Sequence, residues 1–149
     1  MSLAETWRRF RGGPWRVAVA EESMTPALQP GDWLLLDPMP RRWPRRGSVV
    51  VVRQPGTGQL AIKRVTAGPG DVVLTGTGYV KLESQAWLLG DGGGHSVDSR
   101  HYGPVDLEAL VGRAWFRYRP PRRIGTIPRR RSSSARARSS IASKGRLRK

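Results

Sequence analysis

The sequence contains no cysteine among its 149 residues. This absence excludes disulfide bonds, cysteine-ligated zinc sites and thiol catalysis. Histidine is almost as scarce, since only His95 and His101 occur. Two histidines without a cysteine are more often loop residues than metal ligands, so we expect neither a metal site nor a cofactor.

Long apolar runs are also missing. The longest purely apolar runs, such as residues 33–36 and 49–52, have four residues each, whereas a membrane-spanning helix needs roughly 20. Residues 1–20 are basic but have no long apolar core, so they do not resemble a signal peptide. The sequence predicts a cytoplasmic protein without a transmembrane segment, with a membrane-peripheral location as the alternative.

Acidic residues are few, 11 against 27 Lys plus Arg, and the net charge is +16. Residues 122–149 hold 11 of the basic residues and no acid, so residues 1–121 carry only +5. The segment 122–149 has too few large apolar residues to offset its ordering entropy, and we expect it to be disordered. This segment would bind nucleic acid or anionic lipid through its positive charge. Alternatively, it would remain solvated without a specific partner.

Short β-type runs separated by Gly and Pro dominate the rest of the chain, which predicts one mainly β domain. We expect a basic N-terminal segment at 1–14, the folded domain at 15–121 and the tail at 122–149. Helix candidates are limited to residues 3–10 and a turn at 106–110. Strands are predicted at residues 16–20, 33–36, 48–53, 60–66, 71–75, 79–82, 86–89 and 110–118, with hairpin loops at 54–59 and 76–78.

Two loops combine Arg with Trp, at residues 7–11 and 41–46. Such a combination suits a membrane interface or single-stranded nucleic acid. The favoured interpretation is a solvated edge loop in which Trp43 folds back on the sheet, because charge runs specify partners weakly.

Ser23 lies in a turn, Glu-Glu-Ser-Met-Thr-Pro, shortly before a predicted strand. The turn is either a surface loop or the presentation of a nucleophile. On the strand 60–66, Lys63 shares its face with Ala61 and Val65, which makes it a candidate for burial. Burial would lower the lysine pKa from about 10.4, and a neutral lysine can activate a serine hydroxyl. The strand pattern alone favours a lysine that reaches out to solvent.

The glycine-rich segment 88–105 predicts a tightly folded loop. Asp98 and Arg100, two positions apart, can pair with each other or clamp neighbouring loops. Ser96 can hydrogen-bond a nearby amine. Each of these features singly also fits an ordinary turn.

Together and in this order, three segments resemble the type I signal peptidase family over about residues 17–119. Self-cleaving repressors share the first two, but the Asp-Ser-Arg loop favours signal peptidases. The segments are Ser23-Met24-X-Pro26 with Gly31-Asp32; Lys63-Arg64-Val65 with Gly70-Asp71; and Gly90-Asp91 with Ser96-X-Asp98-Ser99-Arg100, Gly103-Pro104-Val105 and Gly112-Arg113-Ala114.

The resemblance implies a mostly β catalytic core and a role for each matching residue. Ser23 matches the nucleophile, and its backbone N–H would serve in the oxyanion hole. Lys63 matches the general base, and Ser96 matches the serine that orients the lysine amine. Asp98 and Arg100 match a structural salt-bridged pair. The implied function is serine endopeptidase cleavage of an N-terminal pro- or signal segment, with small residues such as Ala before the cut and substrate bound as an added strand.

The sequence departs from this family at several points. Glu21 occupies the position where some members place a serine that completes the oxyanion hole, and Glu22 adds a second carboxylate. Both would oppose an oxyanion unless they point to solvent. Gly92-Gly93-Gly94-His95 replaces the family's Asn-Arg-Asp-Asn, and only 27 steps separate Lys63 from Gly90, too few for a large extra β domain.

The short, anchorless sequence is most similar to the nickel-type superoxide dismutase maturation proteases, which implies that enzyme's precursor as substrate. One alternative is a membrane-peripheral signal peptidase that binds the bilayer through its Trp/Arg loops and tail. Another is a catalytically weak β module that binds nucleic acid or anionic surfaces through the tail.

Overall fold

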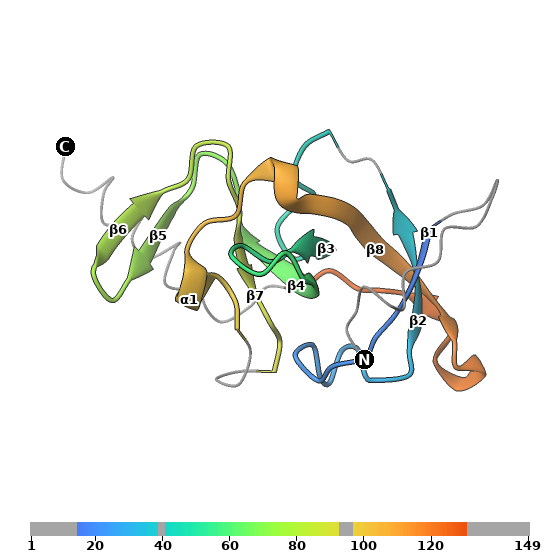
Figure 1. Cartoon of the computed structure of the whole chain (residues 1–149). Helices are drawn as coiled ribbons and strands as arrows, with labels where there is room; N and C mark the ends of the chain where they lie inside the picture. The colour runs from blue at the N-terminus through green and yellow to red at the C-terminus, as the bar shows by residue number, and fades with distance from the viewer. Residues whose placement is uncertain (1–14, 39–40, 93–96, 131–149) are drawn as a thin grey trace.

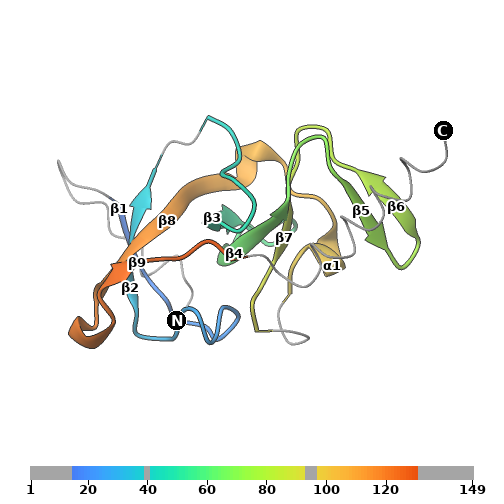
Figure 2. The ribbon, with the colours of Figure 1, turned by 180° about the vertical axis from the view of Figure 1, so that it is seen from behind.

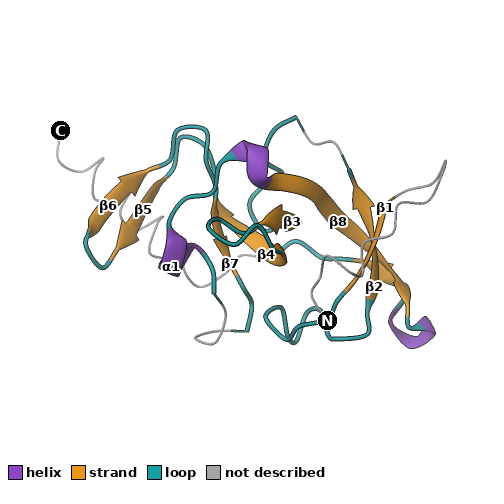
Figure 3. Cartoon of the chain, in the orientation of Figure 1, coloured by secondary structure: helices purple, strands orange, loops and turns teal. Residues whose placement is uncertain are grey.

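The computed structural model describes residues 15–38, 41–92 and 97–130, and its regular secondary structure is mainly strand (Figure 3). Within those residues, no helix is long and apolar enough to cross a bilayer. The strands are β1 (Trp15–Ala18), β2 (Trp33–Asp37), β3 (Val49–Arg53), β4 (Leu60–Ala67), β5 (Val72–Thr75), β6 (Gly78–Lys81), β7 (Trp87–Leu89), β8 (Leu110–Arg119) and β9 (Gly125–Thr126). The helical turns are α1 (Ser99–Tyr102), η3 (Leu107–Ala109) and η4 (Pro121–Arg123).

One antiparallel sheet holds most of the strands, in the order β1-β2-β8-β3-β4-β7. The long strand β8 crosses the middle of the molecule, with β2 along one edge (Figure 1). Its other edge pairs first with β3 and then, near its C-terminal end, with the short β9 (Figure 2). A separate hairpin, β5–β6, projects to one side of this sheet.

The central strands are buried on both faces, because an apolar cluster packs against each side of the sheet. Val49 and Val51 of β3 point into one cluster, while Val50 and Val52 point into the other, as the two-residue period of a strand requires. The same alternation places Ile62 of β4 in the first cluster and Val65 in the second. Every residue of β4 is consequently buried, including its two charged residues.

The predicted fold class and strands are confirmed, with strand ends shifted by a residue or two. Both predicted hairpin loops and the turn at 106–110 are present, the turn as η3. Trp43 does fold back: it is buried, and its Nε1 donates a hydrogen bond to the Ser84 carbonyl at 3.1 Å. The helix α1 was not predicted. The segment 1–14, with its expected helix and Trp/Arg loop, lies outside the described residues.

The prediction of disorder is wrong for residues 122–130, which pack on the domain. Phe116 of β8 pairs with Thr126 of β9, and Ile127 is buried in the first apolar cluster. Arg123 forms an ion pair with the buried Asp32 at 3.2 Å. The folded part therefore extends past the expected boundary at residue 121, to at least residue 130. Residues 131–149 lie outside the described residues.

Candidate active site

Ser23 sits on the loop that joins β1 to β2, and both the backbone and the core hold this loop. Two backbone hydrogen bonds close its base, from Val19 N to Asp32 O at 2.8 Å and from Gly31 N to Val19 O at 2.9 Å. Met24 and Leu28 insert into the first apolar cluster and are almost fully buried. Ser23 itself remains half-buried, at the surface of the loop.

Lys63 lies in the middle of β4, directly opposite Val50 of β3. Only 3% of its surface is exposed, so Lys63 is buried and does not reach out to solvent, although the strand pattern alone favoured a lysine that does. Burial lowers the pKa of its ammonium from the ordinary 10.5. The carboxylates of Asp98 and Glu21 oppose this shift, while the positive charge of Arg100 adds to it.

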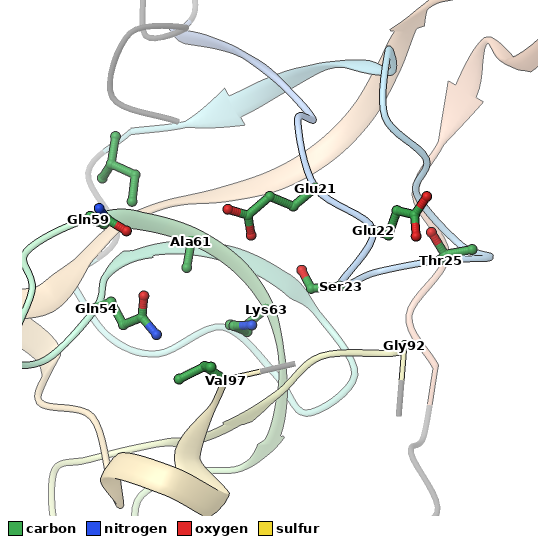
Figure 4. Close-up of a pocket in the computed structure, with 11 residues that line it drawn as sticks. Glu21, Glu22, Ser23, Thr25, Gln54, Gln59, Ala61, Lys63, Gly92 and Val97 are labelled. Carbon is green, nitrogen blue, oxygen red and sulfur yellow. The ribbon is translucent and has the colours of Figure 1, made fainter. Parts of the chain in front are cut away.

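Ser23 and Lys63 line the same cavity, which has a volume of about 600 Å³. Figure 4 shows the serine hydroxyl and the lysine amine on facing walls, with Ala61 beside the lysine. The β3–β4 hairpin contributes Gln54 and Gln59 to the lining. Among the described residues no hydrogen bond joins Ser23 and Lys63. Such contacts are often longer without substrate and tighten when it binds.

Asp98 and Arg100 pair with each other, one of the two arrangements that the sequence allowed. Arg100 Nη2 lies 2.8 Å from Asp98 Oδ2, and its Nε donates to Asp98 Oδ1 at 2.9 Å. The carboxylate is fully buried, caps α1 and accepts a hydrogen bond from Gly90 N at 3.1 Å. Ser99 Oγ accepts another from Leu88 N at 2.9 Å. These contacts fix α1 against β7. Ser96 lies outside the described residues.

Sequence reasoning missed a second ion pair, between Arg64 and Asp91. Arg64 Nε and Nη2 donate to the two carboxylate oxygens at 2.9 and 2.7 Å. Its Nη1 also donates to the carbonyls of Gly47 at 2.8 Å and Pro128 at 3.1 Å. Arg64 and Asp91 both belong to motifs that the sequence analysis singled out, but their spacing of 27 positions did not predict that they pair. Successive residues of β4 thus point to opposite faces of the sheet. Lys63 lines the cavity, and Arg64 is buried and paired with Asp91.

Gly92 contacts the loop of Ser23 directly, a further role that the sequence did not reveal. Its N–H donates to the Ser23 carbonyl at 2.7 Å. A Cβ at this position would lie 3.1 Å from the carbonyl oxygens of both Glu22 and Ser23, tighter than ordinary contacts. The glycine run that follows Asp91 was the available signal, because glycine permits such close backbone approach.

The two glutamates before Ser23 point in different directions. Both glutamates line the cavity; Figure 4 shows the Glu21 carboxylate on the side of Lys63 and the Glu22 carboxylate beside Thr25. Neither carboxylate is therefore removed from the site in which an oxyanion would form. Elsewhere, within the residues that the structure describes, no three His, Asp or Glu side chains are grouped as metal ligands.

Comparisons with known proteins identify the family of this chain. The profile of the signal peptidase, peptidase S26, family matches residues 8–85. Mitochondrial inner membrane protease subunit 1 of Schizosaccharomyces pombe is 35% identical over 112 residues, covering 62% of this chain and 68% of that protein. Subunit 2 of the corresponding protease of Danio rerio is 37% identical over 117 residues, covering 68% and 62%.

A bacterial relative extends the similarity. Signal peptidase I of Leptolyngbya laminosa is 27% identical over 143 residues, covering 73% of this chain and 70% of its own length. The family profile spans more than half of the chain, and the Schizosaccharomyces protein is covered over two thirds of its length. The chain belongs to the peptidase S26 family of signal peptidases.

Proposed function

We propose that this protein is a serine endopeptidase in which Ser23 is the nucleophile and Lys63 the general base. The observation that carries the proposal is the shared cavity, where a half-buried serine faces a buried lysine whose pKa is lowered. A lysine that is neutral at working pH can accept a proton, whereas an ordinary surface ammonium cannot.

The proposed reaction runs through an acyl-enzyme. Neutral Lys63 Nζ takes the proton of Ser23 Oγ while Oγ attacks the scissile carbonyl. The resulting lysine ammonium then protonates the departing amine as the C–N bond breaks, which leaves the acyl group on Ser23. A water molecule, deprotonated by the same amine, hydrolyses the ester and restores both side chains. The Ser23 backbone N–H would donate to the oxyanion, and the family resemblance alone assigns Ser96 the role of orienting the lysine amine.

The electrostatic balance around Lys63 matters to this mechanism. Burial favours the neutral base, and Asp98 and Glu21 pull the pKa back upward. The same two carboxylates would stabilise the ammonium that forms after proton transfer. Asp98 is itself neutralised in part by Arg100, so we assign this pair a structural and electrostatic role rather than a place in the proton path.

The proposed substrate is an extended segment of a precursor protein with a small residue, such as Ala, before the cut. An extended segment can hydrogen-bond to a strand edge along its length, which suits a site walled by strands. The narrower hypothesis, a nickel superoxide dismutase precursor, stays a prediction. The relatives include inner membrane proteases, so the membrane-peripheral alternative also stays open.

The test is cleavage of a precursor peptide with Ala before the scissile bond, with circular dichroism on every variant. Lys63→Met should fold and lose about 10²–10⁴-fold in acylation rate, as is usual when a general base is removed. Lys63→Arg should be nearly as inactive, because a guanidinium stays protonated.

The serine provides the matching half of this test. Ser23→Ala should be inactive, and the Ser23→Ala/Lys63→Met double variant should be no worse than either single variant, because the two residues act as one unit. Retained activity in folded Lys63→Arg would contradict the dyad mechanism, and Lys63 would then be an ordinary buried strand lysine.

A further inference from the structure

A second hollow, of about 650 Å³, opens beside the connection between β2 and β3. Figure 1 places this connection at the opposite end of β2 from the loop that carries Ser23. Among the described residues, none lines both this hollow and the cavity of Ser23 and Lys63. Its charged lining consists of five arginines and one carboxylate: Arg41, Arg42, Arg45, Arg113, Arg129 and Asp37.

The positive charge of this hollow exceeds the negative charge of its one carboxylate, Asp37. Among the described residues, none of the five forms an ion pair with a carboxylate, in contrast to Arg64 and Arg123, which do. Gathering like charges around one concavity raises the electrostatic energy unless an anion enters. Guanidinium groups bind phosphate oxygens through two parallel N–H donors, which makes arginine the preferred side chain for phosphate recognition.

The hollow is built from fixed parts. Trp43, one of its walls, is buried and anchored to the Ser84 carbonyl. Arg113 projects from the central strand β8 and is only partly exposed. Trp43 and Arg113 are therefore held in place by the fold, whereas the loop arginines that line the same hollow are more exposed.

The C-terminal segment completes the hollow, and the buried Arg64 holds it in place. Arg64 Nη1 bonds to the carbonyls of both Gly47 and Pro128, which ties the β2–β3 connection to the residue before Arg129. Arg130 N also donates to the Gly47 carbonyl at 3.2 Å. A Cβ on Gly47 would lie 2.8 Å from the Arg130 carbonyl oxygen, so only glycine permits this approach. The fold itself therefore holds the segment of Arg129 at the hollow that Arg45 also lines.

We propose that this hollow binds a phosphate group, carried by either an anionic phospholipid headgroup or a small free phosphate compound. The proposal does not depend on catalysis at Ser23. It assigns specific arginines to a partner, where the sequence alone allowed only a general attraction by a basic loop and tail.

The experiment compares two double variants of the full chain that lose the same charge. Arg45→Ala/Arg129→Ala removes two of the five arginines that line the hollow, and Arg119→Ala/Arg122→Ala removes two exposed arginines near η4, outside the hollow. The probes are phosphatidylcholine vesicles with and without phosphatidylglycerol, measured by co-sedimentation, and inorganic pyrophosphate, measured by calorimetry. Circular dichroism checks that both variants fold.

At near-physiological salt we expect the hollow variant to bind its probe about 10-fold more weakly or worse, because charge-assisted hydrogen bonds are lost. The matched variant should change about 2-fold or less, because exposed charges are screened. The affinity of Arg45→Lys/Arg129→Lys should lie between those of the two alanine variants. Lysine keeps the positive charge but lacks the two parallel N–H donors of the guanidinium.

The outcomes separate the sources of phosphate. Binding to phosphatidylglycerol vesicles alone supports a lipid headgroup, and binding to pyrophosphate supports a free phosphate compound. Equal weakening in the two alanine double variants would overturn the proposal, since general surface charge would then explain the binding. Failure of the wild-type chain to bind either probe would also overturn it.

Discussion

Replacing Asp91 by alanine would remove two charge-assisted hydrogen bonds from a guanidinium that is almost fully enclosed. The Arg64 side chain is 1% exposed and that of Asp91 is 13% exposed, so water cannot substitute for the lost carboxylate at Arg64. The carbonyls of Gly47 and Pro128 would remain as acceptors, but neither carries a compensating charge. The variant would leave a buried, unpaired cation.

Removing one partner of a buried ion pair costs about 3–5 kcal/mol. Against a total unfolding free energy of about 5–15 kcal/mol, this is a large fraction. For a chain of this size, about 2–4 °C per kcal/mol converts the loss into a fall in Tm of roughly 6–20 °C.

Thermal and denaturant unfolding of the wild type and three variants would measure this loss. Asp106→Ala is the matched control, because Asp106 is exposed and its side chain makes no capping hydrogen bond. Arg64→Met/Asp91→Leu should recover most of the stability, since replacing both charges by apolar groups leaves nothing unpaired. A loss in Asp91→Ala no greater than that in Asp106→Ala would refute the reasoning.

Three other changes probe the site and the domain boundary. Glu21→Gln removes a charge that raises the pKa of Lys63, so the acidic limb of the pH–rate profile should move to lower pH. An unchanged limb would show that Glu21 does not affect the pKa of Lys63. Gly92→Ala should lower activity, because its Cβ would displace the loop of Ser23. Gly76→Ala is the control, because a Cβ at Gly76 would meet open space. Equal activity in the two variants would contradict a role for the Gly92–Ser23 contact. Ending the chain after residue 130 should preserve Tm, whereas also removing residues 122–130 should lower it, because Ile127 and the Arg123–Asp32 pair are lost. Equal melting temperatures for the two truncated chains would contradict this boundary.

The strands were predictable because local chemistry determines them. Glycine and proline interrupt the chain between runs of β-branched residues, and the observed strands follow those interruptions. The strand pattern marked Lys63 only as a candidate for burial, since Ala61 and Val65 flank it on one face, and by itself it favoured a lysine that reaches out to solvent. The strands need only sequence neighbours, whereas the burial of Lys63 needs the whole sheet.

The missed features depend on partners far away in the sequence. Alternation placed Arg64 on the face opposite Lys63, but both faces are interior only because an apolar cluster packs against each side of the sheet. The acceptor of Arg64, Asp91, is 27 positions away. Residues 122–130 looked too polar to fold, because that judgement counted only their own apolar content. Their order comes from β8, Asp32 and the core position that Ile127 fills.

The projecting β5–β6 hairpin offers a place to modify the enzyme without disturbing its chemistry. Its base packs against Ala67, Trp87 and Leu89 in a small apolar cluster of its own, while the turn at Gly76 and Thr77 is exposed. Figure 1 shows this tip directed away from the rest of the sheet. Exposed turn tips of small and polar residues tolerate insertions well. A fluorescent protein, an affinity tag or a surface-attachment peptide could therefore be spliced in at this turn, to give an immobilised or traceable protease.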